Sequence, residues 1–339
     1  MRLPPRWSQD QQSSATPPST ARRTTRWFPL AICIFLSLRP VTDLAATDHG
    51  STLQDRGREL HLSISSEFTA AEQAHITAWI DFVAASLLQV YGHWPREQWQ
   101  ITIVPASAAG DDPIPWAQVH RGTLDNVELF VSPQATLEEL KQDWTGYHEL
   151  AHLLIPYRGW GDAWFSEGLA SYYQNILQAR AGVLTEQQAW QNLYDGFMRG
   201  RADTDYNGQA LAGISDAMRE NGAFMRVYWS GAWYFLAADI RLRQQSGGAV
   251  TLDVALQKLN ACCANEQLSV PQMVSRLDEL NRVLLFQPLY EQLVAAKEMP
   301  SFEKLFASLG IAIVDGTVNL QQQGPGAALR RQILKPIPL

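Results

Sequence analysis

The strongest constraint on the fold is a change in the spacing of apolar residues near residue 161. Before it, short segments rich in β-branched and aromatic residues (99–106, 116–122 and 126–133) alternate with clusters of Gly, Pro and Asp, which is typical of strands and turns. After it, apolar residues recur at helical spacing almost without interruption to residue 310. The sequence therefore predicts an α+β protein, with a small mixed α/β lobe first and a mostly helical lobe second.

Seven helices are predicted in the second lobe. Gly182, Gly247 and Gly310 end three of them, as glycine commonly does after a last helical turn. The expected ranges are 164–181, 185–199, 223–245, 251–262, 269–285, 287–297 and 301–309. The stretch "IAIVDGTVNL" at 311–320 then predicts a hairpin with Asp-Gly at its turn.

Two helices are predicted in the first lobe. Thr69 and Glu72 form a capping box before a run of helically spaced apolar residues that ends at Gly92. Thr136 and Glu139 form a second capping box. Since the chain after it has no break other than Gly146 before Pro156, this second helix is expected to continue to residue 155.

The first 46 residues are expected to lie outside the folded protein. Arg22, Arg23 and Arg26 precede a 12-residue apolar run, 27–38, which is too short to span a bilayer, for which roughly 20 residues are needed. Small residues follow at Ala45 and Ala46, so the pattern predicts a cleaved secretory signal peptide and a periplasmic or secreted protein. An uncleaved membrane anchor is the alternative, and the only membrane contact expected.

Charge and cysteine content exclude several classes of protein. Residues 1–46 hold six arginines and two aspartates, so the formal charge moves from −7 for the whole chain to −11 without them. An acidic protein of this kind is not expected to bind nucleic acid or an anionic membrane surface. Apart from Cys33, the cysteines are the neighbours Cys262 and Cys263. Adjacent cysteines seldom bridge, so we expect packed thiols and no disulfide framework.

The stretch "TGYHELAHLLIPYRGWGDAWFSEGLASYY", 145–173, contains the residues that indicate a catalytic metal site. His148 and His152 are four positions apart, so on a helix both imidazoles leave one face and can reach the same ion. Glu149 is placed to hold and deprotonate a water molecule, which is the logic of a His-Glu-x-x-His motif. Glu167, 15 residues after His152 and at the start of the next helix, can supply the third ligand that a catalytic zinc ion needs.

The alternative is that these residues are ordinary polar groups on an exposed helix face. Histidine is scarce, with seven in the chain, so the spacing together with the downstream "WFSEG" favours a site for one zinc ion. The histidines at 49, 61, 75, 93 and 120 show no ligand spacing. Asp162 is a candidate hydrogen-bond partner for a ligand imidazole, or a helix cap.

His148-Glu149-x-x-His152 followed by "AWFSEGLASYY" resembles the gluzincin metallopeptidases, and most closely the glycyl aminopeptidase family, a relative of the aminopeptidase N and leukotriene A hydrolase group. The stretches "ISDAMRE", "VYWSGAWYFLAADIRLRQQSGG" and "MPSFEKLFASLG" agree with it. The resemblance covers roughly residues 65–315, the catalytic unit only. It implies a thermolysin-like two-lobed fold in which zinc is bound by two histidines and a glutamate.

Within this resemblance, Tyr228 in Tyr-x-x-Gly matches a tyrosine that donates a hydrogen bond to the developing oxyanion. The alternative for Tyr228 is a core aromatic residue. Asp125, in "GTLDN", stands where the related aminopeptidases carry a glutamate that holds the substrate's free amine. The alternative for Asp125 is a hairpin turn, in which Gly, Asp and Asn are common.

The sequence thus predicts a zinc metallopeptidase acting on peptides. His148, His152 and Glu167 are the expected ligands of one zinc ion, Glu149 and Tyr228 the catalytic residues. Aminopeptidase-like action is favoured, and an endopeptidase of a minimal gluzincin type or a non-catalytic zinc-containing module that binds peptides are the alternatives. The expected boundaries are 1–46 for the N-terminal segment, 47–160 for the α/β lobe, 161–325 for the helical lobe and 326–339 for a tail.

Overall fold

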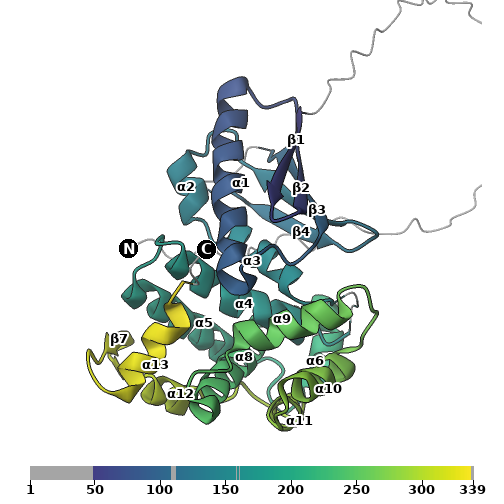
Figure 1. Ribbon diagram of the computed structural model, residues 1–339. Coiled ribbons are helices and arrows are strands. Elements are labelled where there is room, and N and C mark those ends of the chain that lie inside the picture. The colour runs from purple at the N-terminus through teal and green to yellow at the C-terminus, as the bar shows by residue number, and fades with distance from the viewer. Residues whose placement is uncertain (1–48, 108–111, 158, 160, 337–339) are drawn as a thin grey trace, which may run out of the picture. The chain divides into compact units, whose positions relative to one another are not determined.

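A five-stranded sheet forms the first lobe of the computed structural model, which describes residues 49–107, 112–157, 159 and 161–336 (Figure 1). The strands are β1 (His49–Asp55), β2 (Arg58–Ile64), β3 (Gln98–Pro105), β4 (Trp116–His120) and β5 (Asp125–Val131), in the order β1-β2-β3-β5-β4. The pairs β2·β3 and β3·β5 are parallel and the outer pairs antiparallel. The predicted signal peptide at 1–46 lies outside the described residues.

One face of the sheet is apolar and packs in the same core as helix α1 (Ala70–Tyr91). Strands β2, β3 and β5 alternate buried and partly exposed residues, as expected when one face of a sheet is covered. Thr69 and Glu72 form the predicted capping box of α1, and Gly92 ends it in the left-handed conformation. The hairpin of β1 and β2 was not predicted, because Leu53 is the one apolar residue among the seven of β1.

The helix expected between residues 136 and 155 is instead broken into three short pieces. These are α2 (Leu137–Gln142), α3 (Thr145–Ala151) and the 3₁₀ helix η2 (His152–Leu154). The break falls at Asp143, whose carboxylate accepts a hydrogen bond from the backbone N–H of Thr145 at 2.7 Å. Aspartate competes for backbone donors in this way, and so favours a new helix start over continuation.

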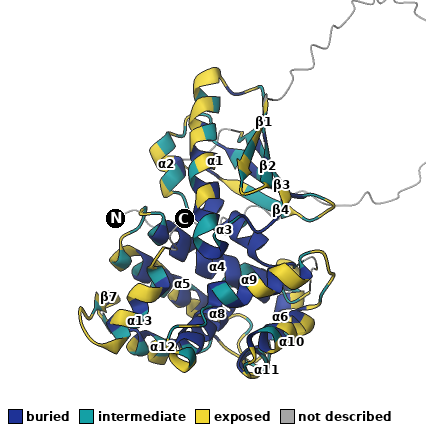
Figure 2. Cartoon of the chain, in the orientation of Figure 1, coloured by how far each residue is buried: buried dark blue, intermediate teal, exposed yellow. Residues whose placement is uncertain are grey.

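The second lobe is helical, as predicted, and its innermost helices are the most deeply buried (Figures 1 and 2). Its elements are α4 (Ala163–Arg180), α5 (Glu186–Ala202), α6 (Leu211–Asp216), α7 (Met218–Asn221), α8 (Phe224–Ser246), α9 (Leu252–Cys263), α10 (Val270–Asn281), α11 (Phe286–Val294), α12 (Glu303–Ser308), β6 (Ile311–Val314), β7 (Thr317–Leu320) and α13 (Pro325–Leu334). None of the helices in the described ranges could span a membrane.

Most of the predicted helices are confirmed to within a few residues, but α6 and α7 were missed. Helix α10 ends earlier than expected because Arg282 adopts the left-handed conformation, with φ 55°. Asp278 then accepts hydrogen bonds from the backbone N–H groups of Leu285, Phe286 and Gln287, which starts α11. The predicted hairpin of β6 and β7 is confirmed, with Asp315 and Gly316 both at positive φ.

Two expectations about the C-terminal half are wrong. Residues 326–334 do not form a tail, because Pro325 begins α13 and Arg330, fully buried, donates hydrogen bonds to the carbonyls of Leu309 and Gln321. Cys262 and Cys263 are joined by a disulfide. They are the last two residues of α9.

Helices α4 and α8 pack at backbone distance, and this contact lies next to Glu167 and Tyr228 in the sequence. Gly168 of α4 faces Gly231 of α8, and a Cβ on either glycine would overlap the backbone of the other helix. Glu167 precedes the first glycine, and Tyr228 lies one turn before the second. The close approach therefore sets the separation between Glu167 and Tyr228.

We expect Gly231→Ala to destabilise the protein by about 1–3 kcal/mol, because the added methyl group would overlap the carbonyl oxygen of Trp164. Urea denaturation followed by circular dichroism measures this change. Gly213→Ala is the matched control, since no atom lies within 4 Å of its added Cβ and α6 gains a better helix former. Equal midpoints for Gly231→Ala and the wild-type protein would contradict this account of the packing.

Candidate metal centre

His148, His152 and Glu167 converge on one point. His148 lies in α3, His152 begins η2, and Glu167 lies in the second turn of α4. The Nε2 atom of His148 is 3.3 Å from Oε2 of Glu167, and Nε2 of His152 is 3.7 Å from the same oxygen. The two imidazole rings are 5.0 Å apart between centroids and nearly perpendicular. The structure therefore brings together the three predicted ligands.

This donor set fits a tetrahedral zinc ion. Zinc binds imidazole nitrogen and carboxylate oxygen at about 2.0–2.2 Å, so two ligand atoms of a tetrahedral site lie about 3.3–3.6 Å apart. The separations of 3.3 and 3.7 Å are of this size. Both histidines are buried, with 4% and 6% of their surface exposed, whereas the side chain of Glu167 is 21% exposed. Two imidazoles and one carboxylate also leave a fourth position open, as in catalytic zinc sites.

The other ring nitrogens of both histidines are held by α4. Nδ1 of His148 lies 2.8 Å from Oε1 of Gln174, and Nδ1 of His152 lies 2.8 Å from Oγ of Ser166. A hydrogen on each Nδ1 leaves the electron pair of Nε2 free for a metal. Neither partner was predicted from the sequence. Gln174 lies seven positions after Glu167, and this helical spacing could have indicated that both residues share a face.

Burial and neighbouring charges set the protonation of the three ligands. Burial lowers the pKa of His152 to about 3, so that its ring is neutral at pH 7. Burial also acts to lower the pKa of His148, but its hydrogen bond to Glu167 and the charges of Glu149 and Glu167 outweigh burial and raise it. Burial acts to raise the pKa of Glu167, yet the two histidines lower it overall, which keeps this carboxylate ionised.

Glu149 lies beside the two histidines. Its carboxylate and the ring nitrogens of His148 and His152 lie within 4.8 Å of one another. Burial raises the pKa of Glu149 to about 7, helped by the charge of Glu167 and opposed by His148 and Arg121. A carboxyl group with such a pKa can both accept and release a proton near neutral pH, which suits the role predicted for it.

Tyr228 reaches the same site from α8. Its ring stacks on His148 at 6.1 Å between centroids, and its hydroxyl group shares a hydrogen bond with Glu167. Burial raises the pKa of Tyr228 well above 10, so the hydroxyl keeps its proton. The ring therefore packs against the core, as the alternative interpretation expected, and the hydroxyl lies at the metal centre. Its role toward an oxyanion stays a prediction.

Asp125 and Asp162 are the two remaining residues that the sequence singles out. Asp125 begins β5 directly after the turn that follows β4, and it forms ion pairs with Arg96 and Arg121. The turn is thus confirmed as its backbone setting. Asp162 precedes α4 in the left-handed conformation and accepts a hydrogen bond from the indole of Trp164. Ser166 and Gln174, not Asp162, form the hydrogen bonds to the Nδ1 atoms of the two imidazoles.

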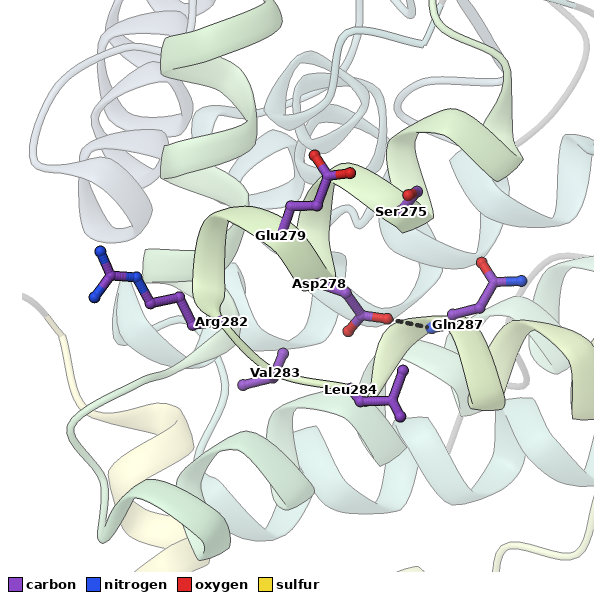
Figure 3. A pocket seen from close by; sticks show the side chains of 7 residues that line it. All are labelled: Ser275, Asp278, Glu279, Arg282, Val283, Leu284 and Gln287. Carbon is purple, nitrogen blue, oxygen red and sulfur yellow. Dashed lines mark hydrogen bonds between the residues drawn. The ribbon is translucent and has the colours of Figure 1, made fainter.

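Two pockets on the described residues are lined by residues outside the metal centre. One, of about 450 Å³, lies between α10 and α11 (Figure 3). It is lined by Ser275, Asp278, Glu279, Arg282, Val283, Leu284 and Gln287. Its central carboxylate, Asp278, accepts the backbone hydrogen bonds that start α11, so its role is to cap that helix. A second pocket lies along β1, β2 and β3 on the sheet.

Comparisons with known proteins concern the family resemblance and the fold. Residues 160–232, which include Glu167 and Tyr228, match the family model described as M61 glycyl aminopeptidase. The fold is similar to an aminopeptidase N family protein from Idiomarina loihiensis, with a TM-score of 0.58 and 18% identity over 78% of this chain and 49% of that chain. The M1 zinc metallopeptidase from Deinococcus radiodurans gives a TM-score of 0.48 and 14% identity, over 75% and 53% of the two chains.

These likenesses confirm the predicted α+β fold of two lobes and the resemblance to gluzincin aminopeptidases. The chain spans about half the length of the solved structures that it matches. No curated protein matches it. The histidine pair lies outside the segment that the family model matches, so the ligand set rests on the geometry described above.

We expect Gln174→Leu to weaken zinc binding by about 10- to 100-fold, because Nδ1 of His148 would lose the partner that orients its ring. Competition with a chromogenic chelator measures the dissociation constant. Gln178→Leu is the matched control, since Gln178 is also buried on α4 but bonds the backbone carbonyl of Gln142. Equal zinc affinity in the two variants would show that Gln174 does not orient His148.

Proposed function

We propose that this protein is a zinc-dependent peptidase with aminopeptidase-like action on peptides. The observation that carries the proposal is the convergence of two imidazole nitrogens on the Glu167 carboxylate, with Glu149 beside them. The family match over residues 160–232 supports it. The predicted signal peptide supports a periplasmic or secreted location, where peptides would be its substrates.

The zinc ligands and Glu149 would perform different steps of peptide hydrolysis. A zinc ion held by His148, His152 and Glu167 would polarise the substrate carbonyl and lower the pKa of a water molecule. Glu149 accepts the proton of that water as it attacks and then delivers the proton to the departing amine. Its pKa of about 7 lies where one carboxyl group can perform both transfers.

Tyr228 completes the site by stabilising charge. Attack on a carbonyl carbon leaves negative charge on the carbonyl oxygen, and a fixed donor at that oxygen lowers the barrier. The Tyr228 hydroxyl is already at the metal centre, because it bonds Glu167. The packing of α8 on α4 at Gly168 and Gly231 holds the tyrosine there without a flexible loop.

We expect Glu149→Gln to lower kcat by about 10²- to 10⁴-fold while leaving bound zinc near one equivalent, because glutamine cannot take the proton of the attacking water. Cleavage of a mixed peptide library, followed by mass spectrometry, measures activity, and elemental analysis measures zinc. Glu298→Gln serves as the control, since Glu298 is exposed and lies between α11 and α12. Undiminished cleavage by Glu149→Gln would mean that another group is the base.

We expect Tyr228→Phe to lower kcat by about 10²- to 10³-fold with little change in KM, because the lost hydrogen bond forms to the oxygen only as it becomes charged. Steady-state kinetics on one peptide substrate gives both constants. Tyr194→Phe is the control, since Tyr194 packs against Phe302 and Phe306, away from the metal centre. A change in KM alone would assign Tyr228 to substrate binding.

A further inference from the structure

We propose that Asp125 is a positioning residue of the metal centre, and does not hold the amine of the substrate. Through Arg96 and Arg121 it fixes the His152 turn, by which we mean residues 152–155. This inference rests on the proposed function only in taking the His152 site to be catalytic. It assigns a different task to the residue whose sequence context resembles an amine anchor.

Asp125 forms ion pairs with two arginines. Its Oδ2 atom lies 2.8 Å from Nε of Arg96 and 2.9 Å from Nη1 of Arg121. Asp125 and Arg96 are buried, with 3% and 7% of their surface exposed, and the side chain of Arg121 is 14% exposed. The carboxylate charge is thus balanced by two guanidinium groups inside the protein. An ammonium group of a substrate would have to compete with both.

Both arginines reach from Asp125 to the His152 turn. Arg121 donates through Nη2 to the carbonyl oxygen of His152, and Arg96 donates through Nη2 to that of Ile155 at 2.9 Å. The hydroxyl of Tyr91 donates to the carbonyl between them, on Leu154, at 2.6 Å. Carbonyl groups at the end of a helix have no partner within the helix, and cationic donors are favoured there. Three side chains therefore fix the backbone that carries His152.

The same network joins the two lobes. Arg96 donates through Nη1 to Oδ1 of Asn260 in α9, and Nδ2 of Asn260 donates to the carbonyl of Pro95 at 2.7 Å. The sheet, the His152 turn and the helical lobe are thus linked through one buried guanidinium group. Because His152 lies in a short 3₁₀ turn and not in the middle of a helix, its position depends on these contacts more than that of His148 does.

Removing the Asp125 charge should therefore disturb the metal site and leave recognition of the amine unchanged. Without it, the buried guanidinium group of Arg96 and the partly buried one of Arg121 would lose the charge that they share, and their hydrogen bonds to the carbonyls of Ile155 and His152 would weaken. Metal ligands lose affinity when their supporting contacts are removed, typically by about 10- to 100-fold. An amine anchor would behave differently, since it touches only the substrate.

The experiment compares Asp125→Asn with the wild-type protein in three measurements. We expect the zinc dissociation constant to rise about 10- to 100-fold. In the metal-free protein, we expect the imidazole ¹⁵N signals of His152 to shift more than those of His148. With zinc in excess, we expect kcat/KM to fall by the same factor for a peptide with a free N-terminus and for its N-acetylated form, whichever the enzyme cleaves faster.

Asp253→Asn is the matched control. Asp253 is also buried beside two arginines, Arg180 and Arg243, but these bond the carbonyls of Gln89, Gln332 and Ile333. Its substitution should lower the thermal midpoint and leave zinc affinity unchanged. Should Asp125→Asn fail to fold, Arg121→Gln tests the same link, because it removes the donor to His152 and leaves the Arg96 ion pair with Asp125 in place.

Unchanged zinc affinity, with a loss confined to the peptide that has a free N-terminus, would overturn the proposal and restore Asp125 as the amine anchor. Unchanged zinc affinity in a folded Arg121→Gln protein would also overturn it. A wild-type protein that binds zinc and cleaves no peptide would instead refute the proposed function. The zinc and histidine measurements would still decide the role of Asp125 in that case.

Discussion

The metal centre depends on helix α4, which packs between the segment that carries the histidines and helix α8. One face of α4 supplies Glu167 together with Ser166 and Gln174, which orient the two imidazoles. On its other side, Gly168 meets Gly231 of α8 and brings Tyr228 to the same place. A single helix thus sets the third ligand, the orientation of the first two and the distance to the candidate oxyanion donor.

Electrostatics explains why so many polar groups are buried at this point. Burial alone would raise the pKa of Glu167 and lower that of both histidines. The three groups offset this cost by facing one another, and the hydrogen bonds from α4 satisfy the remaining ring nitrogens. A cation bound among them would relieve the cost further, and it would couple metal binding to folding stability.

Much of the fold and of the candidate site could be predicted from local patterns. The spacing of His148, His152 and Glu167, and helices such as α1, α4 and α8, follow from periodicity and capping residues. Most of what could not be predicted depends on contacts across the chain. The docking of Arg330 on the carbonyl of Leu309 needs the folded neighbours, and Arg96 reaches Asp125 from the loop before β3. The break at Asp143 is local, since it depends on a hydrogen bond from Thr145, and it was missed because only Gly and Pro were taken as helix breaks.

X-ray absorption at the zinc edge of the purified protein tests whether His148, His152 and Glu167 hold one zinc ion. The account predicts one zinc ion surrounded only by nitrogen and oxygen at about 2.0–2.2 Å, with the multiple-scattering pattern of two imidazoles. One of those imidazoles should disappear in His152→Ala. A spectrum dominated by sulfur at about 2.3 Å would mean that cysteine thiolates hold the metal, and would contradict the assignment of this site.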